Sequence, residues 1–207
     1  MAKGKKETFV NQDGSPLHLN LSPDQISSQT IFLVADPGMV HQVSQFFDKV
    51  DLEINRPDMI IHSGIYKQKL ISVASTGVGS DNAEIFHNEM DALFNYNFRE
   101  QHPGDFRKLT FVRLGMTESI QQDIGVGAAL ITEHSIGIDN LMSFYQLPQS
   151  EAEKMLAQKV QEDLMLPFQP YVIHSSSALH DRLKKNFIEG STFSLPGYYA
   201  SKGRKLR

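Results

Sequence analysis

The sequence predicts an α/β fold in which a mixed, twisted central sheet is flanked by helices. Short apolar runs without polar alternation recur along the chain, and such runs are typical of strands buried on both faces. Helical patterns separate several of these runs, which indicates a layered sheet. A chain of 207 residues fits one domain best. We therefore expect a single domain over 1–207, with an irregular lead-in over 1–30.

In the first half of the chain, strands are expected at 31–35, 59–66 and 69–75, and helices at 40–50 and 81–97. Lys67 and Gln68 join two of these strands, which predicts a hairpin. Asp81, with Glu84 three residues later, is expected to cap the second helix. One face of that helix is expected to hold Phe86, Met90, Leu93 and Asn97.

In the second half, strands are expected at 109–115, 128–134 and 171–175, and helices at 150–163 and 177–187. We expect the strand at 109–115 to be buried and the last helix to be capped by a serine. Ligands of open α/β sheets bind outside the carboxyl ends of the strands. The loops after Ala35, Ser75 and Leu114 are therefore the candidate places for chemistry.

Composition excludes several classes of protein. The chain has no cysteine, which excludes a disulfide scaffold, a thiolate zinc site and a cysteine nucleophile, and which fits a reducing compartment. The longest apolar run, 31–35, is far shorter than the roughly 18 residues of a membrane span. The basic start is not followed by an apolar stretch, so no signal peptide is expected. We expect a cytoplasmic protein without a membrane partner.

Charge is distributed unevenly along the chain. The net charge is −4, but residues 182–207 hold seven basic residues and one acid, a balance of +6. Such an end is typical of a solvated tail or of a surface that binds a polyanion. The eight histidines show no metal-ligand spacing, so no metal site is expected.

Each candidate loop has two interpretations. The segment 35–39 is either a tight turn or an anion site built from backbone N–H groups. The glycine-rich segment 75–80 is a structural turn or a ligand loop, and it matches neither the dinucleotide fingerprint nor the P-loop. Arg113 ends an apolar strand, where we expect it to be buried and paired with a phosphate or with an internal carboxylate.

Six short motifs occur in a characteristic order: Asp-Pro-Gly (36–38), Asn-Arg (55–56), Ser-Thr-Gly-Val-Gly (75–79), Asn-Glu-Met-Asp-Ala-Leu (88–93), Arg-x-Gly-x-Thr (113–117) and Gly-Tyr-Tyr-x-x-x-Gly-Arg (197–204). Together they resemble the uridine phosphorylase branch of the nucleoside phosphorylase family. The resemblance runs from about Leu17 to Arg207.

The resemblance implies that a pyrimidine nucleoside is cleaved by inorganic phosphate into base and ribose 1-phosphate. It implies a homo-oligomer with the site at a dimer interface and phosphate as co-substrate. It implies that no cofactor or metal is needed. A nucleic-acid partner is not expected, although binding of nucleic acid through the basic end is a weaker alternative.

The resemblance also implies a role for each matching residue. Arg113 and Arg56 match phosphate-binding arginines, Arg56 reaching in from a neighbouring subunit, and Gly38 belongs to the phosphate loop. Thr117 matches a threonine near ribose and phosphate, and His18 a histidine that crosses the interface to the ribose. The base would be contacted by Tyr198, Lys202 and Arg204. Arg113, Thr117 and Arg204 would be the catalytic residues.

The chain departs from the family pattern at several of these positions. Met39 replaces a phosphate-binding arginine, and Met116 replaces a hydroxyl-bearing residue. Glu118 replaces a glycine beside the expected phosphate dianion. Lys202 replaces a glutamine that reads the uracil amide, and lysine donates hydrogen bonds but cannot accept them. We expect the family's C-terminal portion, with its Glu-Met-Glu-like ribose-binding segment, to be lacking. The alternative is a non-catalytic relative that keeps the scaffold for ligand or partner binding.

Overall fold

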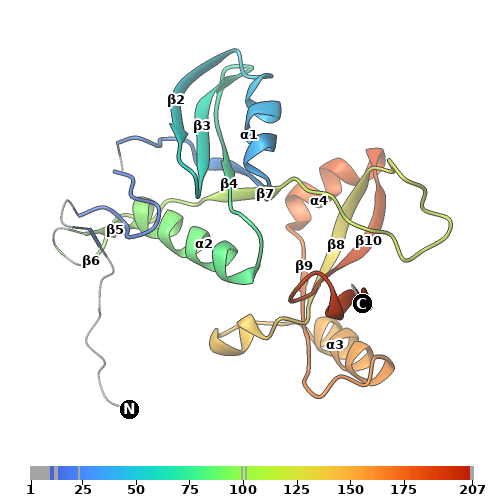
Figure 1. Ribbon diagram of the computed structural model, residues 1–207. Coiled ribbons are helices and arrows are strands. Elements are labelled where there is room, and N and C mark those ends of the chain that lie inside the picture. Colours follow the sequence, from blue (N-terminus) through green and yellow to red (C-terminus); the bar gives the residue numbers. More distant parts are fainter. Residues whose placement is uncertain (1–9, 12–13, 23, 99, 101, 206–207) are drawn as a thin grey trace. The chain divides into compact units, whose positions relative to one another are not determined.

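The computed structural model describes residues 10–11, 14–22, 24–98, 100 and 102–205. The chain divides into two compact units, Met1–Gly115 (unit 1) and Met116–Arg207 (unit 2) (Figure 1). Each unit has its own sheet and its own helices. None of the helices in the described ranges is long and apolar enough to cross a bilayer.

Unit 1 is built on a five-stranded mixed sheet with the order β2-β3-β4-β1-β7. Its strands are β1 (Thr30–Val34), β2 (Lys49–Asn55), β3 (Ile60–Tyr66), β4 (Lys69–Ser75) and β7 (Thr110–Arg113). Strand β1 pairs in parallel with both β4 and β7, whereas β2, β3 and β4 form antiparallel neighbours. The carboxyl ends of β1, β4 and β7 therefore meet at one edge of the sheet.

Helices α1 (Pro37–Ser44) and α2 (Ser80–Asn95) belong to unit 1, together with the short antiparallel pair β5 (Tyr96–Asn97) and β6 (His102–Pro103). Asp36 caps α1, and its side chain accepts a hydrogen bond from the amide of Gly38. Helix α2 begins after Gly79 without a side-chain cap. Its apolar face packs into the core through Phe86, Met90 and Leu93, as the sequence predicts.

The core of unit 1 also includes side chains from the irregular lead-in. The described residues before β1 form turns and one isolated bridge, yet Leu19, Leu21 and Ile26 are buried against β1, β3 and α2. A separate cluster under α1 contains Val34, Val40 and Val73. The described part of the lead-in around these side chains is therefore packed into unit 1. Burying the three apolar side chains contributes roughly 1.5–3 kcal/mol each to the stability of the unit.

Unit 2 contains a three-stranded sheet with the order β10-β8-β9. Its elements are β8 (Leu130–Gly137), η1 (Leu141–Phe144), α3 (Glu151–Asp163), β9 (Tyr171–His174), α4 (Ser177–Leu183), η2 (Lys184–Asn186), β10 (Ile188–Ser194) and η3 (Ala200–Lys202). Strand β8 is parallel to β10 and antiparallel to β9. Ser150 and Glu153 form a complete capping box at the start of α3.

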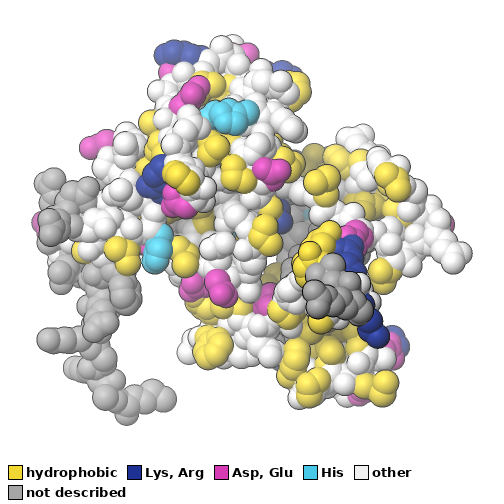
Figure 2. All heavy atoms as spheres, viewed as in Figure 1, with side chains coloured by type: hydrophobic (Ala, Val, Ile, Leu, Met, Phe, Trp, Pro, Cys, Tyr) yellow, Lys and Arg dark blue, Asp and Glu magenta, His cyan; other side chains and the backbone are white. Residues whose placement is uncertain are grey.

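The core of unit 2 is smaller than that of unit 1. It consists of Ile136, Ala157 and Val172, with partly buried neighbours on α3. Several large apolar side chains of this unit stay exposed, among them Met155 and Met165, and Figure 2 shows apolar side chains gathered over α3. Unit 2 thus leaves more apolar surface in contact with solvent than a packed layer would.

Most expected elements are present, but some predictions are wrong. Residues 45–50 are not helical, and Lys49 already begins β2. Asp81 lies inside α2 and does not cap it, because the helix starts one residue earlier. The last helix ends at Leu183, and the side chain of Ser176 does not cap it. Strand β7 is not buried: Thr110 and Arg113 are exposed because β7 is the last strand of its sheet.

Candidate functional site

The parallel strands of unit 1 bring three candidate loops to one sheet edge. Val34 of β1 pairs with Ser75 of β4, and Leu33 pairs with Arg113 of β7. Hydrogen bonds continue past the strand ends, from the amides of Thr76 and Leu114 to the carbonyls of Val34 and Leu33. The three loops therefore leave neighbouring strand ends, and their role as places for chemistry stays a prediction.

The first loop is a helix cap that uses the amide we expected to bind phosphate. The Asp36 carboxylate accepts the Gly38 N–H at 2.8 Å. Met39, which stands in place of a family arginine, packs against the Val34, Val40 and Val73 cluster. An anion at this loop would have to displace the Asp36 carboxylate from Gly38. The phosphate-binding role of Gly38 stays a prediction.

The second loop, 76–79, owes its shape to two glycines. Gly77 and Gly79 have φ angles of +71° and +105°, which side chains with a Cβ rarely adopt. Thr76 is tied back to β1, and the side chain of Asn82 donates to the carbonyl of Val78 at 2.9 Å. The loop is therefore held closely by its own contacts.

Arg113 does not match the environment that we expected for it. Its side chain is exposed, and it forms no ion pair with any residue that the structure describes. The guanidinium lies over Gly115, where an added Cβ would be 3.7 Å from Nη2. The expectation of a buried, internally paired arginine is wrong, because β7 is an edge strand. A solvent-exposed cation with free N–H groups can still bind an anion.

A second group of charged residues in unit 1 joins the lead-in, α2 and the β2–β3 connection. We call His18, Arg56 and Glu89 the His18 cluster. Glu89 accepts the backbone N–H of His18 at 3.0 Å and that of Leu19 at 2.7 Å, and one oxygen lies 2.5 Å from Nδ1 of His18. Arg56 donates to the carbonyls of Leu19 at 2.8 Å and His18 at 3.0 Å. The two residues that the resemblance assigns to a neighbouring subunit's site are therefore held together.

Glu89 is a residue that the sequence reasoning did not select. Its side chain is only 15% exposed, whereas that of His18 is 54% exposed. Charge-assisted hydrogen bonds from backbone N–H groups satisfy the carboxylate in place of water. The signal that could have found it is a carboxylate beside the apolar face of a helix, where burial requires a partner.

In unit 2, four residues form what we call the Tyr198 cluster: Glu118, Tyr198, Lys202 and Arg204. Oε1 of Glu118 accepts a hydrogen bond from Nη2 of Arg204 and lies 3.6 Å from Nζ of Lys202. Both cations lie over the ring of Tyr198, at 4.3 Å for Arg204 and 5.0 Å for Lys202. The three residues assigned to the base by resemblance are thus together, and Glu118 joins them.

The charges of the Tyr198 cluster support one another. The hydrogen bond from Arg204 lowers the pKa of Glu118 below its ordinary value, and the nearby Lys202 ammonium adds to that effect. Glu118 in turn raises the pKa of Arg204. The carboxylate therefore stays ionised at neutral pH, and the cluster carries a net charge of +1. The positive charges of Lys202 and Arg204 offset the negative charge that Glu118 adds in place of the family's glycine.

Thr117, the remaining predicted site residue, precedes Glu118 in unit 2. Its side chain is exposed, and Oγ1 is 3.5 Å from the carbonyl of Glu118. Met116 is exposed as well. Both residues lie in a segment without regular secondary structure.

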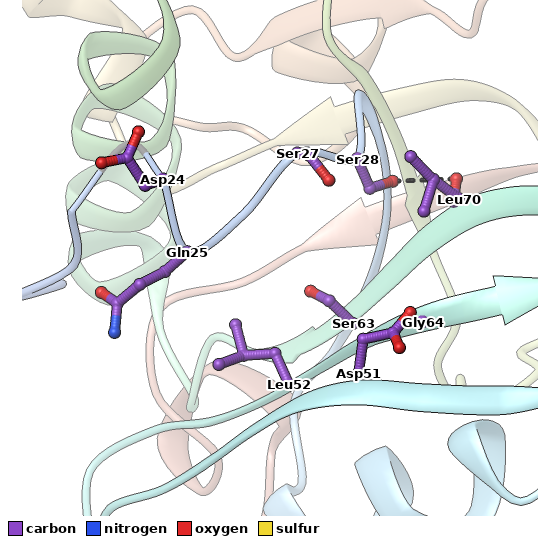
Figure 3. Close-up of a pocket in the computed structure, with 9 residues that line it drawn as sticks. All are labelled: Asp24, Gln25, Ser27, Ser28, Asp51, Leu52, Ser63, Gly64 and Leu70. Carbon is purple, nitrogen blue, oxygen red and sulfur yellow. Dashed lines mark hydrogen bonds between the residues drawn. The ribbon is translucent and has the colours of Figure 1, made fainter.

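A cavity of about 350 Å³ lies in unit 1, and none of the predicted site residues lines it (Figure 3). Side chains of the lead-in and of β2, β3 and β4 line it, including Ser28, whose hydroxyl donates to the Leu70 carbonyl at 3.0 Å. The described residues contain no group of three or more acidic, histidine or cysteine side chains that could hold a metal ion.

Comparison with models of known protein families gives no match. Among curated proteins, the chain is 26% identical over 134 residues to the uridine phosphorylase of Thermococcus kodakarensis, covering 65% of this chain and 43% of that protein. It is 28% identical over 123 residues to the uridine phosphorylase of Escherichia coli, covering 59% and 44%. The chain thus spans less than half the length of these relatives.

Among solved structures, the chain resembles a Trypanosoma brucei nucleoside phosphorylase that shows uridine phosphorylase activity. The TM-score is 0.82 at 25% identity, covering 95% of this chain and 71% of that structure. The chain is therefore related to the nucleoside phosphorylases, and it has their mixed α/β fold.

Proposed function

We propose that the chain takes part in the phosphate-dependent cleavage of a pyrimidine nucleoside to free base and ribose 1-phosphate. The observation that carries the proposal is the assembly of two clusters from residues far apart in sequence. His18 and Arg56 meet in one of them, and Tyr198, Lys202 and Arg204 meet in the other. The relationship to the nucleoside phosphorylases supports the same reaction class.

The chemistry of this reaction fits these groups. Positive charge develops on the ribose ring in the transition state, while a phosphate dianion approaches and an anionic base departs. Cations and hydrogen-bond donors that are already fixed lower the barrier most where such charges develop. Arg113 supplies an exposed guanidinium for phosphate, and the net positive Tyr198 cluster suits a base that leaves as an anion. Inorganic phosphate is the co-substrate, and no cofactor is required.

We also propose that a second copy of the chain completes the phosphate site. The resemblance assigns His18 and Arg56 to the neighbouring subunit, and two of the five N–H groups of Arg56 already bond to the lead-in. A homo-oligomer in the cytoplasm is therefore the proposed form. Its site would lie at a dimer interface.

The direct test is release of uracil from uridine by the purified chain, with and without phosphate. We expect phosphate-dependent release, reduced at least tenfold in Arg113→Ala, because charge-assisted hydrogen bonds to an anion contribute roughly 1.5–3 kcal/mol each. The matched control is Arg107→Ala, which removes an exposed arginine of the same unit. Absence of phosphate-dependent release from a folded protein at high concentration would contradict the proposal.

A second candidate function is supported by specific observations. Glu118 forms ion pairs with both cations of the Tyr198 cluster, Met39 is part of an apolar cluster, and the Gly38 amide is bonded to Asp36. These contacts favour a non-catalytic relative that keeps the scaffold for a ligand or partner. Thermal unfolding separates the candidates: an enzyme is stabilised by uridine with phosphate through mass action, and a scaffold protein responds to neither.

A further inference from the structure

The Tyr198 cluster contains a hydrogen-bond acceptor where the sequence had predicted the loss of one. Lys202 stands in place of a glutamine, and an ammonium group can donate but not accept. A uracil edge offers both a carbonyl, which needs a donor, and an N–H, which needs an acceptor. The lysine by itself therefore reads only half of that edge.

Glu118 brings an acceptor into the same cluster. The contacts to Arg204 and Lys202 both use Oε1, and Oε2 accepts no hydrogen bond from any residue in the described ranges. The side chain of Glu118 is 56% exposed, so Oε2 is open to a ligand. Arg204 donates one of its five N–H groups to Glu118, so the guanidinium and the Lys202 ammonium both have further N–H groups that can donate.

We propose that Glu118 is a specificity-determining residue that accepts the imide N–H of a uracil-type base, with Lys202 and Arg204 donating to the adjacent carbonyl. The inference rests on the proposed function, since it names how that same site reads its base. In this arrangement Lys202 supplies the donor and Glu118 the acceptor, whereas a single glutamine supplies both in the family.

The electrostatics are consistent with this role. One carboxylate and two cations leave a net charge of +1, so the cluster still stabilises a base that departs as an anion. Isolated ion pairs on a surface contribute little to stability. Here two residues close to the chain's end converge on a carboxylate more than 80 positions earlier, over one aromatic ring. A ligand that uses both the cations and the carboxylate would account for this convergence.

A Glu118 carboxylate that only blocks the two cations would affect nucleoside binding in the opposite direction. If the carboxylate only blocks the cations, removing it should strengthen nucleoside binding. If it accepts the imide N–H, removing it should weaken binding and abolish the preference for a base that carries that N–H.

The experiment measures binding of uridine and 3-methyluridine to the full chain by isothermal titration calorimetry. The methylated nucleoside lacks the imide N–H. Glu118→Gln and Glu118→Met are compared with the wild type, because both remove the charge at similar side-chain length and only glutamine keeps an acceptor. Asp163→Asn, a carboxylate paired with Lys159 on the surface of α3, is the control for charge alone.

We expect the wild type, Glu118→Gln and Asp163→Asn to prefer uridine by about tenfold or more, as for other sites built to bond a specific N–H. We expect Glu118→Met to bind uridine about tenfold more weakly and to lose the preference. Equal binding of both nucleosides by the wild type, tighter uridine binding by Glu118→Met, or no nucleoside binding by the wild type would overturn the inference. Binding with the expected preference but without uracil release would overturn the proposed phosphorolysis instead.

Discussion

The two clusters hold their charged groups in different ways. In the His18 cluster, Glu89 and Arg56 bond to backbone amides and carbonyls of the lead-in, and Glu89 is 15% exposed. In the Tyr198 cluster, side chains bond to one another, and each charged member is at least 30% exposed. Backbone partners fix a charge in place, whereas exposed side-chain partners can exchange for a ligand. The His18 cluster of unit 1 is therefore a rigid group of charged residues, and the Tyr198 cluster of unit 2 is an adaptable group.

The largest expected effect comes from removing the anchor of the rigid group. Glu89→Ala leaves the amides of His18 and Leu19 without their acceptor, so we expect the free energy of unfolding of unit 1 to fall by roughly 2–3 kcal/mol. Urea denaturation followed by hydrogen exchange of the β3 amides measures it. Asp91→Ala, an exposed carboxylate on the same helix, should change stability by less than about 0.5 kcal/mol. Equal effects of the two substitutions would contradict the comparison.

The next effect is the acid sensitivity of unit 1. His62 is 2% exposed, its Nδ1 lies 2.7 Å from Oγ of Ser44, and burial lowers its pKa below the ordinary 6.5. The neighbouring Glu53 opposes that shift, and the His41 ring adds to it. The unfolded state then binds more protons, so stability falls as pH drops from 6.5 toward the lower folded value. Hydrogen exchange of the β3 amides from pH 7.5 to 5 should show this loss of stability. In His62→Gln, the stability of unit 1 should change much less over the same pH range.

Unit 2 should respond to acid only at a lower pH. The backbone N–H of His174, followed by the contacts with Ser150, lowers the pKa of Glu153 to about 2. Because the pKa of Glu153 is lower in the folded state than its ordinary 4.5, the ionised carboxylate stabilises the folded protein above pH 4.5. That contribution is lost as the pH falls from 4.5 to about 2. Exchange of the β9 amides measures it, with Glu153→Gln as the variant that lacks the transition. Loss of protection in both units at the same pH would contradict this expected difference between them.

The smallest expected effect is on stability in the adaptable group. Glu118→Met removes an exposed ion pair, and such pairs contribute little to folding. We expect the thermal midpoint to stay essentially unchanged while nucleoside binding weakens. A large drop in the midpoint would mean that Glu118 has a structural role.

Much of the fold could be predicted from local patterns. The apolar run at Ile31 and the periodic apolar face of α2 each indicated burial correctly, and α3 lies where its helical pattern was expected. Strand β2 was missed because its alternation of polar and apolar residues follows a helix without a strong stop signal. Strand β10 was missed because its residues are mostly exposed, so no apolar run marks it.

The candidate site was less predictable, because it depends on contacts between distant segments. No spacing relates Glu89 to His18, 71 positions apart, or Glu118 to Arg204, 86 positions apart. The exposure of Arg113 depends on the position of β7 at the sheet edge, which strand order alone decides. Local sequence indicates which residue types are present, and long-range pairing decides which of them meet.

The measurement that tests the account most directly is complementation between two variants of the chain. Arg113→Ala and Arg56→Ala, each expected to release uracil at least tenfold more slowly than the wild type, are co-expressed and purified together. If Arg113 of one copy and Arg56 of another hold the same phosphate, random pairing leaves about a quarter of the sites intact. We predict about a quarter of the wild-type rate. A mixture no faster than either variant alone would contradict the account.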